Sequence, residues 1–210
     1  MSWTFENYDR LFTALAEHIT MVAAALAVSL AIALPLGIWS ARRPRAYAAA
    51  LAVTGILYTV PALALFALLI PFMGLGQGPA VTALVLYSLM ILVRNVAAGL
   101  RAVPPEVIDA ADGMGFGPFR RLIRIELPLA LPVIVAGVRI AVVMQVSVAT
   151  VAAYISAGGL GDIIFQGITQ DFTEKIVAGA VLTSALAVAA DEALRLLERR
   201  LKPVVCPDAA

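Results

Sequence analysis

The longest uncharged stretch of this sequence most constrains what the chain can fold into. No Asp, Glu, Lys or Arg occurs over residues 46–93, a run of 48 residues. A helix needs about 20 mostly apolar residues to cross a bilayer, so this run is too long for one crossing. The Gly- and Pro-rich segment 71–79 divides it, because such residues favour a turn. The run therefore predicts two membrane-spanning helices, at about 46–70 and 80–100, and Pro61 predicts a bend in the first of them.

Three further apolar stretches are long enough to cross a membrane, at about 19–39, 132–156 and 176–197. Hydrophobic residues make up 62% of the 210 residues and charged residues 14%, whereas soluble domains contain roughly 45–50% and about 25%. A chain of this length cannot bury so much apolar surface in a core of its own. We therefore expect an all-α membrane protein, a polytopic bundle of about five transmembrane helices that forms one domain over residues 1–210.

The basic residues indicate how the chain is oriented, because Lys and Arg favour the cytoplasmic side of a membrane. Five spans place the segments 42–45, 101–127 and 195–202 on the same side, and these segments hold 11 of the 15 basic residues. The N-terminus is therefore expected outside and the C-terminus in the cytoplasm. The net charge of +1 gives no general attraction to nucleic acid, so the expected partner surface is the lipid membrane.

Residues 101–127 form the longest expected cytoplasmic segment. The Pro-Pro-Glu sequence at 104–106 suits a helix start, because a first-turn proline needs no amide partner and an acid complements the helix dipole. The glycines within 113–117 suit its end, and a second short helix is expected at about 118–126. An apolar face on the first helix is formed by Val107, Ile108, Ala110, Ala111 and Met114. Such a face predicts docking, either on a partner protein or on the lipid surface.

The expected outer segment 157–173 is irregular and rich in glycine, with Gly158, Gly159 and Gly161 followed by Asp162. Irregular backbone close to a bilayer persists only where protein or water satisfies its polar groups. Two interpretations fit these residues: a gate at the outer mouth of a pathway, or a plain loop.

Two arginines, Arg94 and Arg139, fall inside expected spans. Ionisable residues within a membrane are costly and often functional, which favours a role in a pathway or a gate. Both also lie near the cytoplasmic end of their spans, where a long side chain can reach the interface and act as a structural anchor. Asp191 and Glu192, near the inner end of the last span, are candidate partners, and Asp191 can instead pair with Arg195 along its own helix.

A spaced motif lies within the cytoplasmic segment. The sequence Asp109-Ala110-Ala111 is followed after three residues by Gly115, then after nine residues by Ile125, and after one more by Leu127 and Pro128. This pattern resembles the signature of the permease subunits of bacterial ABC importers, in which Glu stands at the position of Asp109. The resemblance implies that Asp109, Ala110, Ala111 and Gly115 belong to a coupling helix that seats in a groove of an ATPase.

Three further stretches, at 35–42, 125–134 and 154–164, resemble the osmoprotectant permeases, which import glycine betaine, choline, carnitine and related compounds. The permeases of methionine importers share much of the same pattern, so a methionine or other amino-acid importer is the alternative. Either resemblance implies a type I ABC importer permease fold in a bacterial inner membrane. Aromatic faces attract quaternary ammonium ions. Five side chains could therefore line a pathway for such an ion, or could instead pack in the core: Tyr58, Phe66, Tyr87, Met144 and Tyr154.

The chain carries no motif for ATP hydrolysis, because neither of its lysines, Lys175 and Lys202, belongs to a Gly-x-x-x-x-Gly-Lys-Ser/Thr loop. We therefore expect no enzyme activity and no cofactor in this chain, with ATP and Mg bound by a separate pair of ATPase subunits. The resemblance also implies two further partners: a second permease copy or a homologous permease, and an extracytoplasmic substrate-binding protein. An ATP-independent channel or secondary transporter is the competing class, which would need ion-coupling groups near the midplane of the membrane. One Cys and one His also disfavour a metal or disulfide site.

Overall fold

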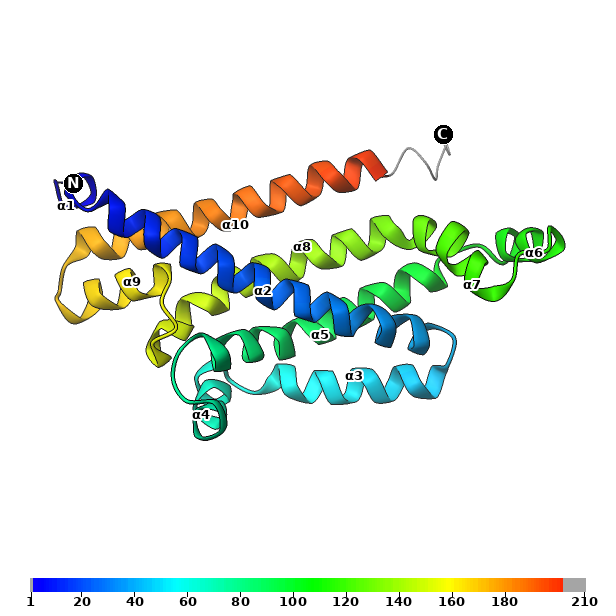
Figure 1. Ribbon diagram of the computed structural model, residues 1–210, viewed down its shortest axis with the longest axis horizontal. Coiled ribbons are helices and arrows are strands. Elements are labelled where there is room, and N and C mark those ends of the chain that lie inside the picture. The colour runs from blue at the N-terminus through cyan, green and yellow to red at the C-terminus, as the bar shows by residue number, and fades with distance from the viewer. Residues whose placement is uncertain (1, 202–210) are drawn as a thin grey trace.

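The computed structural model describes residues 2–201, and apart from short turns this part of the chain is helical (Figure 1). The long helices lie side by side as a bundle, and short ones lie at its two ends. In chain order the elements are α1 (Ser2–Glu6), α2 (Tyr8–Ala41), α3 (Pro44–Thr59), α4 (Ala62–Met73), α5 (Gln77–Arg101), α6 (Pro105–Gly113), α7 (Pro118–Arg121), the π-helical turn η1 (Leu122–Glu126), α8 (Leu127–Val151), the 3-10 turn η2 (Ala152–Ile155), α9 (Leu160–Thr169) and α10 (Thr173–Leu201).

Four helices are long and apolar enough to cross a membrane: α2, α5, α10 and the continuous helix that contains α8. A fifth candidate is the pair α3 and α4, which is bent by 97° at its junction. Pro61 precedes α4 and has no amide hydrogen to donate, and Val60 before it is extended, with φ −67° and ψ 129°, as a residue before proline prefers. The expected all-α fold of about five spans is confirmed, and its second span is broken at the predicted proline.

The turn between α4 and α5 is shorter than the sequence predicts. Helix α4 continues through Pro71 to Met73, and glycine rather than proline ends it. Gly74 and Gly76 take φ angles of 75° and 110°, which glycine alone adopts readily. The Gly76 amide donates to the Ile155 carbonyl at 2.7 Å, so this turn is tied to the end of η2.

Helix α5 lies in the middle of the bundle and packs on both α2 and α8. Glycines allow these helices to approach closely. A Cβ on Gly37 of α2 would lie 2.6 Å from Val96 of α5, and a Cβ on Gly137 of α8 would lie 2.4 Å from Asn95 of α5. Small residues at helix contacts are a common packing device in membranes. In the apolar stretch of α10, by contrast, only 6% of the residues are buried, and the rest are partly or fully exposed. Lipid or another subunit can cover its outer face.

Two short segments differ from their predictions. The expected separate helix at 118–126 is continuous with the helix of the next span, because α7, η1 and α8 form one helix over Pro118–Ile155. The physical reason is that no glycine lies between Pro118 and Pro128 to end a helix. The plain-loop interpretation of 157–173 is also wrong, because α9 occupies most of that segment and packs against α10 and α2.

Candidate functional site

Helix α6, which carries the first part of the spaced motif, projects from one end of the bundle (Figure 1). Pro105 and Glu106 occupy its first turn, as the sequence predicts. The chain then turns at Gly115, whose φ of 80° is left-handed, and the Phe116 amide donates to the Ala111 carbonyl at 3.1 Å. Nothing lies within 4 Å of a Cβ placed on Gly115. This position therefore needs glycine for its backbone angle and not for space.

The exposed surface of α6 includes Asp109, Ala110 and Met114, and Met114 is 68% exposed. Ala111 is instead fully buried within this chain, so the prediction that its side chain faces a partner is wrong. Consecutive residues point about 100° apart around a helix of 3.6 residues per turn. Ala111 therefore lies on the side of α6 that packs against its own chain, while Ala110 remains outside.

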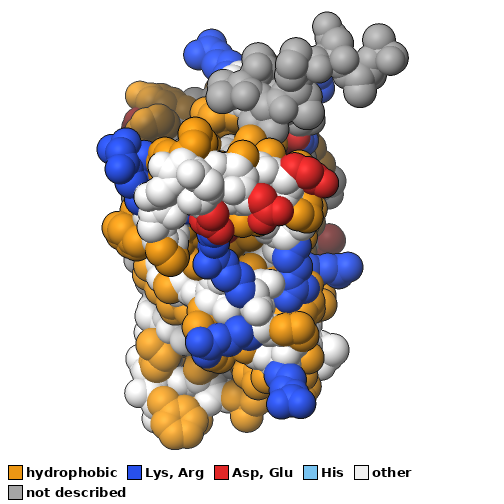
Figure 2. All heavy atoms as spheres, turned by 90° about the vertical axis from the view of Figure 1, so that its right-hand side faces the viewer, with side chains coloured by type: hydrophobic (Ala, Val, Ile, Leu, Met, Phe, Trp, Pro, Cys, Tyr) orange, Lys and Arg blue, Asp and Glu red, His pale blue; other side chains and the backbone are white. Residues whose placement is uncertain are grey.

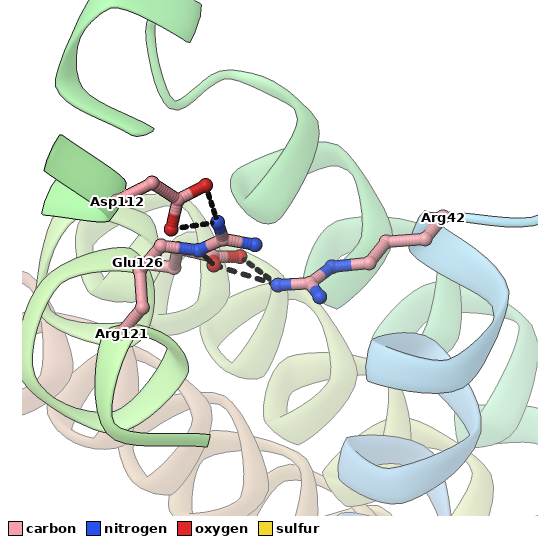
Figure 3. Close-up of polar contacts among 4 residues, drawn as sticks. All are labelled: Arg42, Asp112, Arg121 and Glu126. Carbon is pink, nitrogen blue, oxygen red and sulfur yellow. Dashed lines mark hydrogen bonds and ion pairs between the residues drawn. The ribbon is translucent and has the colours of Figure 1, made fainter. Parts of the chain in front are cut away.

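The second part of the motif surrounds a buried carboxylate at the junction of η1 and α8. The side chain of Glu126 is only 3% exposed. It accepts hydrogen bonds from Nη2 of Arg42 at 2.6 and 2.7 Å and from Nε of Arg121 at 2.8 Å (Figure 3). Charge-assisted bonds of this kind are the strong ones in proteins. The motif residues on either side of this carboxylate are Ile125, Leu127 and Pro128.

Arg121 continues the contact from Glu126 to α6. Its Nη1 donates to both carboxylate oxygens of Asp112 in α6 while its Nε holds Glu126 (Figure 3). An arginine guanidinium stays protonated in proteins, so both contacts are ion pairs. We call Arg42, Glu126, Arg121 and Asp112 the stem network. It forms a continuous chain of ion pairs from the end of α2 to α6.

The end of α5 also holds the end of α2. Arg101 donates from Nε to the Ala41 carbonyl at 2.8 Å and from Nη2 to the Ser40 carbonyl at 3.3 Å. The last carbonyls of a helix lack amide partners within it, so an arginine is a natural cap. The same guanidinium lies 4.0 Å from the centre of the Tyr47 ring. Both segments that flank α6 therefore contact the last turn of α2.

Figure 2 looks at this end of the molecule and shows basic side chains spread across it, with acidic side chains grouped among them. The acidic residues of α6 are Glu106, Asp109 and Asp112, and all are exposed; α6 contains no Lys or Arg. Segments that bind an anionic lipid surface are rich in Lys and Arg. The charge of α6 therefore favours docking on a protein over docking on lipid.

The opposite end of the bundle carries the glycine-rich turn before α9. Gly158 and Gly159 take φ angles of 81° and 80°, and the Gly159 amide donates to Oε2 of Glu17 in α2 at 2.9 Å. A Cβ on Gly158 would lie 2.7 Å from that carboxylate, and a Cβ on Gly161 would lie 2.1 Å from the Thr150 carbonyl oxygen. The glycines thus let the turn lie directly on α2 and α8, where a hydrogen bond holds it.

Arg139 on α8 is bound to α10. Its Nε and Nη2 donate to Asp191 at 3.0 Å each, and its Nη1 donates to Glu198 at 2.7 Å. The predicted pairing with Asp191 is confirmed, and it gives Arg139 a structural anchor. Arg195 forms its hydrogen bonds with the glutamate three residues before it. The sequence spacing also predicts a pair between Glu198 and Lys202, but Lys202 lies outside the described residues.

Of the other pathway candidates, Met144 lines a groove of about 920 Å³ between α8 and α10, together with Arg139. Arg94 is exposed on α5 and does not line this groove. Tyr154 is 63% exposed and lies edge-on to Phe165, with ring centres 4.2 Å apart. The part of this groove formed by residues 2–201 contains no aromatic side chain, so the structure shows no aromatic cage there.

Residues 33–203 match the family described as the inner membrane component of binding-protein-dependent transport systems. The chain belongs to this family. Similar proteins include the carnitine transport permease protein OpuCB of Listeria monocytogenes, 37% identical over 94% of this chain and 91% of that one. The choline transport system permease protein OpuBB of Bacillus subtilis is 37% identical over 89% and 86%, and the osmoprotectant import permease protein OsmW of Salmonella typhimurium is 37% identical over 96% and 96%.

The fold of this inner membrane component is also that of a solved chain of the MetNI methionine ABC transporter in an inward facing conformation. The two superpose with a TM-score of 0.83 over 91% of this chain and 95% of the other, at 23% sequence identity. A second crystal form gives 0.80 over 88% and 93%, at 24% identity. The expected type I importer permease fold is confirmed.

In this inner membrane component, sequence reasoning found the motif but missed the stem network. The available signal was Glu126 itself, an acid between Ile125 and Leu127. A buried charge needs a partner, and Arg121, five residues earlier, is a local one. The contact with Arg42 could not be read from the sequence, because Arg42 lies 84 residues away. Among residues 2–201 no group of three or more His, Cys, Asp or Glu is placed to hold a metal ion.

Proposed function

We propose that this chain is the transmembrane permease subunit of an ATP-driven importer for a small osmoprotectant such as glycine betaine, choline or carnitine. The observation that carries the proposal is similarity along nearly the whole chain to permeases named for these substrates, at 33–40% identity. The exposed helix α6, with its acidic surface and its spaced motif, supports coupling to an ATPase. The inner membrane family supports a bacterial inner membrane as the location.

The proposed assembly contains two permease chains, either identical or homologous, and a cytoplasmic dimer of ATPase subunits that binds ATP and Mg. An extracytoplasmic binding protein delivers the substrate to the outer end of the bundle. Closure of the ATPase dimer moves the two α6 helices, and the paired bundles change between inward-facing and outward-facing states. The exposed apolar stretch of α10 supports burial of part of each bundle against lipid or a second chain.

Reconstitution tests the substrate. The permease is purified with its ATPase and binding protein, placed in lipid vesicles with ATP inside or outside, and supplied with labelled glycine betaine, choline, carnitine or methionine. We expect ATP-dependent movement of at least one of the first three. Movement of methionine alone would overturn the osmoprotectant assignment, and equal movement without ATP would favour a channel or a secondary transporter.

Substitutions in α6 test the coupling. Ala110→Glu places a charge on the exposed side of the helix, where an ATPase groove would bury it without a partner, and an unsatisfied buried polar group costs about 1–3 kcal/mol or more for a charge. Gly115→Val forces a branched residue into a left-handed turn. Both variants should be made at normal levels, lose ATPase in a pull-down, and lose uptake. Retention of the ATPase by both would contradict the coupling role.

Ala111→Glu provides the contrast, because Ala111 is fully buried within the chain itself. This variant should lower the amount of folded permease in the membrane. The same charge one residue earlier, in Ala110→Glu, should spare folding and remove the partner. If the two variants behave alike, the assignment of the outer side of α6 is wrong.

A further inference from the structure

The end of α2 contacts the segments on both sides of α6, although α2 and α6 are not neighbours in the sequence. Arg101, at the end of α5, binds the Ala41 and Ser40 carbonyls from one flank. Glu126, at the start of the α8 helix, binds Arg42 from the other flank. These partners lie 60 and 84 residues apart in the sequence. Movement of α6 can therefore reach α2 only through these non-covalent contacts and side-by-side packing.

Glu126 is built to keep its contact with α2 during a movement. Its side chain is 3% exposed, and that of Arg121 is 13% exposed. Removing one partner from a buried charge is unfavourable, because its loss of hydration is then less well compensated. Here Arg42 is 49% exposed, and Arg121 would remain bound to Glu126. The carboxylate receives Arg42 through two hydrogen bonds and Arg121 through a third. The stem network therefore favours an arrangement in which α2, α6 and the α8 helix remain in contact.

The outer part of the same helix holds the glycine-rich turn. Glu17 of α2 accepts the hydrogen bond of the Gly159 amide at 2.9 Å, and from Glu17 the helix α2 continues through Pro35 to Ala41, with Arg42 as its C-cap. At 1.5 Å per residue this length is about 38 Å, which is more than the thickness of a bilayer's hydrocarbon core, about 30 Å. One helix thus connects the stem network on one side of the membrane to the outer turn on the other.

We propose that α2 is the link that carries displacement of α6 to the outer glycine-rich turn, with Glu126 and Glu17 as positioning residues at its two ends. This inference rests on the proposed function, because it needs an ATPase to move α6. The stem network moves the inner end of α2 together with α6. The Glu17–Gly159 hydrogen bond then moves the turn that opens or closes the outer end of the bundle.

The test uses a reporter cysteine on the outer turn. The single native Cys206 is replaced by Ser, and Ser156→Cys is introduced at an exposed position of the turn. The complete complex of permease and ATPase is reconstituted, and the rate of cysteine labelling by an impermeant maleimide is measured with and without ATP. Uptake per ATP hydrolysed and the amount of bound ATPase are measured on the same vesicles.

Arg42→Gln is the main variant, because it cuts the connection to α2 and leaves Glu126 bound to Arg121. We expect normal ATPase binding, continued ATP hydrolysis, and a loss of roughly fivefold or more in both the ATP-dependent labelling change and the uptake per ATP, the range of a typical coupling energy. Glu126→Gln and Glu17→Gln should show the same pattern. Arg45→Gln removes an exposed arginine from the same segment and should behave as the wild type does.

The possible outcomes distinguish failure of the proposed link through α2 from failure of the proposed function. An unchanged labelling response in Arg42→Gln overturns the link and leaves the transporter intact. Loss of bound ATPase in Arg42→Gln also overturns it, because the arginine would then serve only the shape of the cytoplasmic end. A wild-type complex that binds no ATPase, or that shows no response to ATP, overturns the proposed function and the link together.

Discussion

Gly161 marks a very close backbone contact between α9 and α8, because a Cβ there would lie 2.1 Å from the Thr150 carbonyl oxygen. Gly161→Ala must push α9 away from α8, and overpacking of this kind costs about 1–3 kcal/mol. We expect the purified variant to unfold at a lower temperature than the wild type in detergent. Gly55→Ala is the matched control, since a Cβ there meets nothing within 4 Å and alanine favours a helix. Equal losses in both variants would contradict the steric explanation.

Asp162 in α9 is expected to make the stability of the folded protein depend on pH. Burial raises the pKa of its carboxyl above the usual 3.8, and the charge of Glu17 raises it further. A raised pKa means that the folded state binds the proton more tightly than the unfolded state does, so this contribution to stability is complete below pH 3.8 and is lost as the pH rises through the raised pKa. Asp162→Asn should therefore unfold at a higher temperature than the wild type near neutral pH, with an advantage that shrinks as the pH falls. Melting curves between about pH 4 and pH 8 check this, and an advantage that grows in acid would refute it.

At the scale of elements, the attachment of α10 to α8 depends on Arg139. Its side chain is 23% exposed and binds Asp191 and Glu198, of which Glu198 is only 10% exposed. Arg139→Gln leaves two carboxylates facing each other with less positive charge between them, so α10 should loosen. We expect faster proteolysis near the C-terminal end of α10, where Glu198 lies, and a lower unfolding temperature.

Arg195→Gln is the control for that measurement. Arg195 and its partner Glu192 are 38% and 46% exposed on one helix, and an exposed pair of this kind contributes typically less than about 1 kcal/mol. The control should melt close to the wild type. A larger effect in Arg195→Gln than in Arg139→Gln would show that α8 does not hold α10 through this arginine.

The long elements could be read from the sequence, because an apolar run must be solvated by lipid whatever its neighbours are. The predicted span 80–100 lies within α5, Gln77–Arg101. The ends of the helices were harder to predict from the sequence. Helix α2 begins at Tyr8, well before the predicted span at 19, because hydropathy marks the part of a helix within lipid and charged turns can extend it. The buried side of α6 and the contact of Glu126 with Arg42 could not be read at all, since both depend on which segments meet in space.

For the whole molecule, the proposed orientation is open to a direct test. The stem network and α6 lie at one end of the bundle, and the outer turn lies at the other (Figure 1). A reporter enzyme that is active only outside the cytoplasm should work when fused at Gln77 or Gly167 and fail when fused at Arg43 or Phe116. Activity at Phe116 would reverse the proposed orientation, and activity at all four positions would contradict a spanning bundle.

The distance along the chain between Arg42 and Glu126 also sets an order of events during biosynthesis. The arginine is made 84 residues before its carboxylate, and at 5–20 residues per second this interval is roughly 4–17 seconds. Through that time the guanidinium of Arg42 lacks its carboxylate, although Arg101 is already made and can hold the end of α2. Attachment of α2 to the segment that follows α6 is therefore the later of the two steps. A nascent chain that stalls before residue 126 lacks the carboxylate that joins Arg42 to the α8 helix.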